Sequence, residues 1–239
     1  MKKSAVLVAS AMVLASANAN ADAIGVYIGA QAWDMAAEGS YADNQVQDEF
    51  VFEDESESRF YIELEHPVPF IPNFKVAQSG IEVNGVELSS IQDVALGATN
   101  IDISYTDYTL YYELFDNGLF SFDFGLTGKD LDGEFQSVDQ AGLDVDSVDA
   151  VIPMLYVSAE VGLPLTGLSA FAEGNFLSFD GHTLSDYQAG IAYAVIDNMV
   201  VDVDLQLGYR AVNMELDDLD GIYSDLKFDG AFAGVEVHF

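Results

Sequence analysis

The stretch Leu119–Lys129, LFSFDFGLTGK, alternates strictly between apolar residues and polar or small ones. One face would carry Phe120, Phe122, Phe124 and Leu126, and the opposite face Ser121, Asp123, Gly125, Thr127 and Lys129. Alternation over this length is typical of a β-strand whose two sides meet different surroundings. The stretch follows Asn117-Gly118, a dipeptide typical of tight hairpins because both central positions of that turn favour positive φ. We therefore predict a hairpin that turns at residues 117–118.

The same alternation recurs along the rest of the chain. Val201–Arg210, VDVDLQLGYR, again places apolar residues on one face and polar or small ones on the other. Applying the rule throughout predicts ten strands, which lie near residues 24–34, 58–66, 73–82, 100–115, 119–130, 149–163, 167–178, 186–196, 199–215 and 224–239.

The connections between these strands fall into two kinds. Four are short and rich in turn-forming residues, namely HPVPFIPN, DNG, PLTG and IDN. The others are longer and acidic, and lie near residues 35–57, 83–99, 131–148, 179–185 and 216–223. Short and long connections alternate, so one end of the sheet would have tight turns and both termini, and the other end long loops.

An even number of antiparallel strands with short turns at one end and long loops at the other is typical of outer-membrane β-barrels. We therefore predict an all-β fold, a closed antiparallel transmembrane barrel over residues 22–239. Ten strands are expected, with eight as the alternative, joined by short periplasmic turns and long acidic extracellular loops. Closure would remove the exposed strand edges that a membrane does not tolerate.

A secreted β-sandwich or a lipocalin-like barrel is the competing interpretation, because it also alternates but turns its apolar face inward. The alternation of connection lengths favours the membrane barrel. Aromatic residues close to the expected strand ends also favour it, because such residues collect at membrane interfaces. These aromatic residues are Phe70, Phe74, Phe115, Phe120 and Phe239.

Residues 1–21 have the pattern of a secretory signal peptide. Lys2 and Lys3 precede an apolar run from Ala5 to Ala15, and Ala19 and Ala21 form an A-x-A cleavage pattern. The apolar run is too short to span a bilayer as a helix. We predict cleavage after Ala21.

Charge excludes several classes of partner. The chain has 41 acidic and 7 basic residues. Removing Lys2 and Lys3 with the signal peptide leaves 5 basic residues, so the formal charge of the mature chain is 5 − 41 = −36. A nucleic-acid binder needs a basic patch, so we expect no nucleic-acid partner. The chain contains no cysteine, so disulfides cannot stabilise it.

The end of the chain, AFAGVEVHF, resembles the C-terminal sorting signal of bacterial outer-membrane barrels. Phe239, Val237 and Gly234 occupy the aromatic, apolar and glycine positions of that signal, whereas Phe232 departs from its usually polar position. The mature chain, which opens with AIGVYIGAQAW and contains LGYR at 207–210, also resembles a family of small, functionally uncharacterised outer-membrane barrels of Gram-negative bacteria. The resemblance implies an outer-membrane location, contact with lipid and lipopolysaccharide, and recognition of the last strand by the barrel-assembly machinery. It implies no catalytic activity.

The polar faces of the expected strands would form the barrel interior. Buried charges must pair or remain hydrated, and a ten-stranded barrel leaves little free space. The interior would therefore be either a hydrogen-bonded plug or a narrow, acid-lined path for small cations. The candidate interior residues are Glu113, Asp123, Lys129, Glu160, Glu173, Asp202, Asp204 and Arg210.

Much of the remaining acid lies in the expected outer loops, in residues 48–57, 130–134 and 217–221. Carboxylates suit Ca²⁺ or Mg²⁺, although the spacing does not follow a calcium-loop motif, and a solvated surface is the simpler interpretation. The expected function is a structural envelope role or passage of small solutes. A surface-interaction or divalent-ion-binding protein is the alternative.

An enzyme is the most remote interpretation. Outer-membrane proteases of the omptin type are ten-stranded and use an Asp-x-His pair, to which Asp180-Gly181-His182 is similar. The second aspartate pair of such proteases has no counterpart, because only the isolated Asp93 and Asp102 are available. Lipase, phosphate-loop and dinucleotide motifs are absent from the sequence. We therefore expect no enzyme activity and no cofactor.

Overall fold

The computed structural model describes residues 24–42, 48–88, 95–138, 143–179, 181–198, 200–219 and 222–239. Within these ranges the regular structure is antiparallel β-sheet. None of these residues belongs to a helix long and apolar enough to cross a membrane. The strands are β1 (Gly25–Ala42), β2 (Asp48–Phe52), β3 (Glu55–Glu65), β4 (Asn73–Leu88), β5 (Ala95–Asp116), β6 (Phe120–Val138), β7 (Leu143–Leu163), β8 (Leu168–Phe179), β9 (His182–Asp197), β10 (Asp202–Leu219) and β11 (Ile222–His238).

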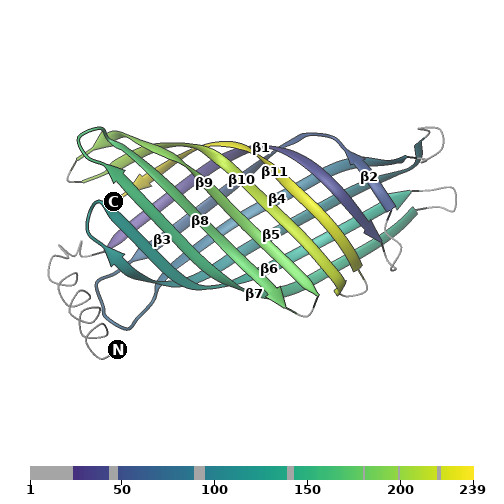
Figure 1. Ribbon diagram of the computed structural model, residues 1–239, viewed down its shortest axis with the longest axis horizontal. Coiled ribbons are helices and arrows are strands. Elements are labelled where there is room, and N and C mark those ends of the chain that lie inside the picture. Colours follow the sequence, from purple (N-terminus) through teal and green to yellow (C-terminus); the bar gives the residue numbers. More distant parts are fainter. Residues whose placement is uncertain are drawn as a thin grey trace, which may run out of the picture.

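The sheet closes on itself into a barrel (Figure 1). Neighbours in sequence pair from β3 to β11, and β11 then pairs with β1, which pairs with β3. The short strand β2 pairs with β1 and β4 and prolongs the arm begun by β3. The ring of hydrogen bonds therefore passes through ten strands, which confirms the expected closed barrel.

The break between β2 and β3 is a β-bulge. Met35 on β1 lies opposite Glu55, and Glu38 on β1 lies opposite Val51. Two residues separate Met35 from Glu38. On the partner arm three residues separate Glu55 from Val51, so this arm has one extra residue. The strands number eleven because this irregularity divides one of the ten arms into β2 and β3.

The tight turns and both described chain ends lie at one end of the barrel (Figure 1). At the β5–β6 turn the backbone N–H of Leu119 and that of Phe120 donate to the Asn117 side-chain oxygen, at 3.0 and 2.9 Å. Only Gly118 in this turn has a positive φ, of 70°. The turn is therefore at the expected place, but it has three residues between the strands rather than a two-residue turn with two positive φ angles.

The strands at the opposite end are longer than expected. The barrel wall includes most of the residues expected to be long loops, because β1 continues to Ala42, β5 begins at Ala95, β6 continues to Val138 and β7 begins at Leu143. A bilayer requires only about 9–11 residues of each tilted strand, whereas β5 has 22 and β7 has 21. The surplus of about ten residues raises the wall by roughly 25 Å above the membrane at the usual strand rise and tilt.

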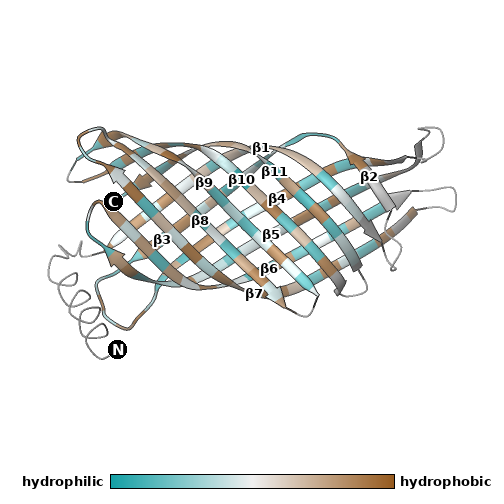
Figure 2. Ribbon diagram, in the orientation of Figure 1, coloured by the Kyte–Doolittle hydropathy of each residue, from teal (hydrophilic) through white to brown (hydrophobic). Residues whose placement is uncertain are grey.

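The polarity of the two wall faces inverts along the strands. On β6 the outward residues are Phe122, Phe124 and Leu126 near the turn, and then Asp130, Asp132 and Glu134 further along. The inward residues change in the opposite sense, from Asp123 and Lys129 to Leu131 and Phe135. Figure 2 shows how hydrophobic and hydrophilic residues alternate along the strands. We call the part with the apolar exterior the membrane half, and the part with the polar exterior the outer half.

The interior of the outer half is a packed apolar core, as in a soluble β-barrel. Its side chains are almost fully buried and come from strands all around the ring. The polar inward faces expected from the sequence are therefore confined to the membrane half. The core includes Trp33, Met35, Ile81, Val83, Ile101, Ile103, Leu131, Phe135, Val148, Ile152, Met154, Leu184, Val212, Met214, Leu226, Phe228 and Phe232.

Candidate functional site: two ion-pair layers above an acidic vestibule

Four of the five basic residues that follow the signal peptide lie inside the barrel. Arg59, Lys75, Lys129 and Arg210 have exposed fractions of 6, 6, 1 and 2%. The fifth, Lys227, lies on the outer wall, where its Nζ is 2.8 Å from Asp229. In a chain so rich in acids, the cations are thus concentrated in the barrel interior.

Two of these cations and two aspartates form the upper ion-pair layer, Asp107, Lys129, Asp186 and Arg210. The guanidinium of Arg210 donates to both oxygens of Asp186, at 3.0 Å from Nε and 2.9 Å from Nη2. Lys129 Nζ lies 2.9 Å from Asp107 and 3.2 Å from Asp186. The layer therefore joins β5, β6, β9 and β10 across the barrel interior.

Aromatic and hydroxyl groups complete the surroundings of this layer. The Tyr105 hydroxyl accepts from Arg210 at 2.8 Å, and Arg210 also donates to the Ser79 hydroxyl at 3.3 Å. Lys129 Nζ lies 3.5 Å from the centroid of the Tyr105 ring, and the Arg210 guanidinium lies 4.9 Å from that of Trp33. Since Trp33 belongs to the apolar core, the upper layer directly adjoins the core.

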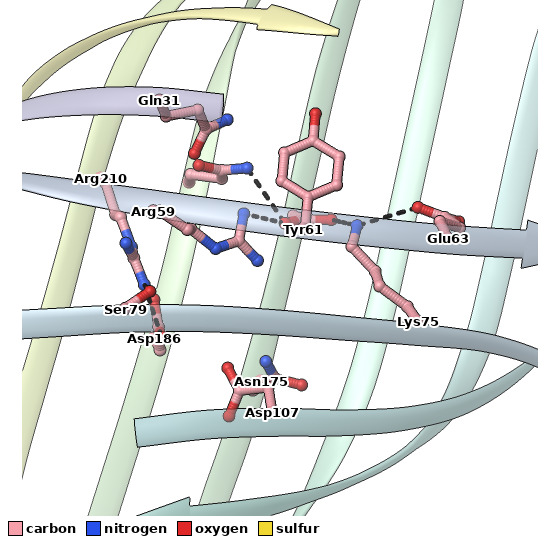
Figure 3. A network of polar contacts seen from close by, with 12 residues as sticks. Gln31, Arg59, Tyr61, Glu63, Lys75, Ser79, Asp107, Asn175, Asp186 and Arg210 are labelled. Carbon is pink, nitrogen blue, oxygen red and sulfur yellow. Dashed lines mark hydrogen bonds and ion pairs between the residues drawn. The ribbon is translucent and has the colours of Figure 1, made fainter. Parts of the chain in front are cut away.

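The lower ion-pair layer consists of Arg59, Glu63, Lys75 and Glu173. Arg59 donates to Glu173 at 2.9 Å, and Lys75 pairs with both Glu173 and Glu63, at 2.5 and 3.2 Å. In Figure 3 Lys75 extends toward Glu63, while Arg210 reaches Ser79 and Asp186. The lower layer joins β3 and β4 to β8 on the far side of the ring.

Each layer holds two cations and two carboxylates. Removing charges from water is costly, and opposite charge repays that cost only when partners lie close and remaining polar groups are hydrogen-bonded. Glu173 also accepts from Gln188 at 3.0 Å and from the Tyr156 hydroxyl at 3.3 Å. The two layers are thus charge-balanced sets of ion pairs that link strands across the barrel interior.

A cavity of about 330 Å³ lies below the lower layer, at the end with the tight turns. We call it the vestibule. Its wall includes Gly118 and Leu119 of the β5–β6 turn. One lysine, Lys75, faces it together with nine acidic residues, which come from seven strands. The acids are Glu63, Glu65, Glu113, Asp116, Asp123, Glu160, Glu173, Asp204 and Glu236.

Tyrosines and amides bind several of the vestibule acids. The Tyr111 hydroxyl donates to Glu63 and also lies 3.0 Å from Glu65, and Asn73 Nδ2 donates to Glu113 at 3.0 Å. The Tyr61 hydroxyl donates to Glu236 at 2.5 Å. Tyr61 reaches that acid because its ring covers Gly29, where a Cβ would lie only 2.0 Å from the ring.

The sequence-predicted interior residues all lie in the membrane half, but at four different levels. Lys129 and Arg210 lie in the upper layer and Glu173 in the lower one. Glu113, Asp123, Glu160 and Asp204 line the vestibule. Asp202 lies closer to the open end, where its carboxylate is 3.8 Å from His238.

Two of the four residues of the upper layer and three of the four residues of the lower layer were not predicted from the sequence. The missed residues are Asp107 and Asp186 above, and Arg59, Glu63 and Lys75 below. A usable signal was present, because Arg59 and Lys75 occupy inward-facing positions of their strands in a chain with very few cations. The acids carry no such signal, since acidic residues are common throughout the sequence.

The residues considered for protease and metal chemistry lie partly outside the part of the chain that the structure describes. Asp93 and Asp180 lie outside the described residues, and the exposed Asp102 points away from the barrel interior, whereas its neighbours Ile101 and Ile103 are buried. Residues 130–134 belong to β6 rather than to a loop. Across the ranges that the structure describes, no group of three or more acidic or histidine residues is placed to hold a metal ion.

The last strand closes the ring against the first. The Phe239 backbone N–H donates to the Val26 carbonyl at 3.0 Å, and the exposed side chains of Val235 and Phe239 lie on the outer face. Phe232, which departs from the sorting-signal pattern, points inward and lies 6.3 Å from the Phe171 ring, measured between centroids. Its departure is explained by its place in the apolar core.

A closed ten-arm ring with an apolar outer face in one half defines an integral outer-membrane β-barrel. The five aromatic residues expected at the interface are exposed and lie at the tight-turn end, as this class requires. Neither a protein-family model nor a curated protein matches the sequence.

Solved structures of the same class are similar in fold. The outer-membrane protease OmpT from Escherichia coli superposes with a TM-score of 0.50 and 9% identity, over 91% of this chain and 97% of that one. The translocator domain of the autotransporter NalP from Neisseria meningitidis gives a TM-score of 0.46 and 11% identity, over 97% and 95%. Neisserial surface protein A superposes with a TM-score of 0.37 and 14% identity, over 90% of this chain and 97% of that one.

Proposed function

We propose that this protein is a sealed, structural outer-membrane barrel that contributes to envelope integrity and does not conduct ions. The observation that carries the proposal is the filled cross-section. A solute that enters from the vestibule meets the lower ion-pair layer, then the upper layer, and then the apolar core of the outer half. This arrangement supports the plug interpretation over a narrow path for cations.

Recording from single proteins in planar lipid bilayers tests the proposal. Purified wild-type protein is expected to give no conductance steps. The double variant Trp33→Ala, Phe228→Ala removes two large side chains from the core, and it is expected to remain non-conducting if it folds, because both ion-pair layers stay in place. Cation-selective steps from the wild-type protein would overturn the proposal and support a conducting path.

A cellular measurement addresses the envelope role. Cells that lack the protein are expected to take up a hydrophobic fluorescent dye faster, and plasmid-borne wild-type protein is expected to restore the barrier. Unchanged dye uptake in the deletion strain would contradict the envelope role without affecting the bilayer result.

The exterior of the outer half supports a second candidate function. It would act as a surface that attracts divalent cations and, through them, lipopolysaccharide. Glu82 lies opposite Asp102 on the next strand, and Asp102 lies opposite Glu134, so three outward carboxylates form one row. Asp132 and Asp149 form a second facing pair. Facing like charges are destabilising, so cations would be attracted to this surface. A melting temperature that is the same in chelator and in millimolar Ca²⁺ would contradict this candidate.

A further inference from the structure

The vestibule contains more carboxyl groups than the cations of the protein pair with. Glu63 and Glu173 pair with Lys75 and Arg59. The seven other vestibule acids form no ion pair with any residue that the structure describes. Like charges gathered in a partly enclosed, low-dielectric space raise the local concentration of cations. The vestibule therefore favours a positively charged occupant.

One of these acids points to a ligand by its own geometry. Asp123 lines the vestibule and is only 9% exposed, and its Oδ1 atom is buried without a hydrogen-bond partner. A buried carboxylate oxygen without a partner is costly, because it has lost its water and gained nothing in exchange. An ammonium group in the vestibule would supply the missing hydrogen bond once the Asp123 carboxylate turns this oxygen toward the cavity.

Lys75 shows which kind of cation suits this wall. Its alkylammonium group lies between two carboxylates, Glu63 and Glu173, and it is 5.0 and 5.9 Å from the ring centroids of Tyr61 and Tyr156. Carboxylates together with aromatic faces are the environment that recognises organic ammonium ions. Tyr27 and Phe171 add further aromatic surface to the vestibule.

The remaining acids include two pairs on opposite walls. Glu113 and Asp123 lie directly opposite each other on β5 and β6, and Asp204 and Glu236 do so on β10 and β11. In the closed ring, three strands separate these walls in each direction: β7, β8 and β9 on one side, and β1, β3 and β4 on the other. The two carboxylate pairs therefore face each other across the lumen.

We propose that the vestibule binds a linear organic cation with two ammonium groups, one at each carboxylate pair, that enters from the periplasmic side. The cavity volume of about 330 Å³ lies within the usual range of small-molecule sites, about 300–1,000 Å³. The methylene chain of such a ligand would cross the lumen beside the aromatic side chains. This inference does not depend on whether the barrel conducts.

Calorimetric titration of the folded, detergent-solubilised protein with amines of defined length tests the inference. The probes are butylamine, 1,4-diaminobutane and 1,8-diaminooctane. One diamine is expected to bind with 1:1 stoichiometry and at least about tenfold more tightly than butylamine, because it engages both pairs. Equal affinity for the monoamine and both diamines would overturn the proposal, since it would indicate diffuse attraction only.

Matched variants locate the site. Asp123→Asn and Glu236→Gln each remove one charge from opposite vestibule walls, and each is expected to weaken diamine binding about tenfold. Asp102→Asn and Glu134→Gln remove the same charges from the outer wall and are expected to leave binding unchanged. Equal losses in both sets would overturn the proposal. Retention of the fast-migrating folded form on unheated gels shows that each variant is folded.

Magnesium ion is the last probe. Diamine binding is expected to persist when Mg²⁺ is present at the same concentration as the diamine. Displacement of the diamine by equimolar Mg²⁺ would instead assign the vestibule to a divalent metal ion and overturn the proposal.

Discussion

Arg210 donates two hydrogen bonds to Asp186, of 3.0 and 2.9 Å, where the membrane half meets the apolar core. The carboxylate of Asp186 also lies 3.2 Å from Lys129, so one acid pairs with two cations from different strands. Bidentate guanidinium–carboxylate pairs fix both distance and orientation. This residue pair therefore fixes the upper layer at the boundary with the apolar core.

Replacing Asp186 by Asn is expected to destabilise the barrel by about 3–5 kcal/mol, because Arg210 and Lys129 would remain buried without their shared counter-charge. The measurement is the temperature of sample heating at which the fast-migrating folded band disappears on a gel. Asp102→Asn on the exposed outer wall is the matched control, and it is expected to change that temperature little. Equal shifts in the two variants would show that the upper layer stabilises the barrel no more than an exposed charge does.

The interior of the outer half is expected to respond to the loss of a buried side chain as the core of a soluble protein does. Phe228→Ala removes a fully buried ring from this core and is expected to cost about 3–5 kcal/mol. Phe124→Ala truncates a ring on the lipid-facing wall, which is 40% exposed, and is expected to cost clearly less. Urea unfolding of both variants in lipid vesicles gives the comparison. A larger loss for Phe124→Ala would contradict the inverted polarity of the two halves.

Repulsion within the carboxylate row on the outer wall is expected to lower the free energy of unfolding. Asp102→Gln is expected to stabilise the barrel by about 0.2–1 kcal/mol at low salt, because Asp102 lies between Glu82 and Glu134. The gain should shrink at high salt, because exposed charges are screened there. Thermal melts at two ionic strengths check both statements, and a gain that is independent of salt would point to a cause other than charge.

The final aromatic residue should matter for assembly more than for stability. Phe239→Ala is expected to lower the amount of heat-modifiable barrel in the outer-membrane fraction, because the exposed ring of Phe239 occupies the aromatic position of the sorting signal that the last strand resembles. The same variant refolded from urea into detergent should melt near the wild-type temperature. Normal amounts of assembled protein in cells would contradict a recognition role for this residue.

Sequence alternation was enough to predict the class of fold. The lipid-facing pattern of Leu119–Lys129 and the closing strand at Phe239 are both where they were expected. The outer half was missed because its alternation runs with the opposite sense: Asp130, Asp132 and Glu134 are outward and acidic, so this segment resembles an acidic loop. A period-2 pattern identifies the two faces of a strand, but it does not show which face contacts water.

The interior chemistry was predicted less completely. Lys129 and Arg210 were found because they end clear alternating stretches. Their common partner Asp186 comes from a different strand, and only the register that places Gln188 opposite Arg210 brings it within reach. Pairing between strands far apart in sequence depends on ring closure, which no local pattern contains.

The inverted polarity of the outer half also determines what another cell, a phage or an antibody would meet on this protein. The wall that rises above the lipid is a hydrogen-bonded ladder, so Glu82, Asp102 and Glu134 are presented at fixed spacing by three different segments of chain. An antibody that covers this row recognises a discontinuous epitope, which disappears when the chain is denatured. Immunisation with linear peptides from residues 82, 102 or 134 would therefore not reproduce the surface that the folded protein displays.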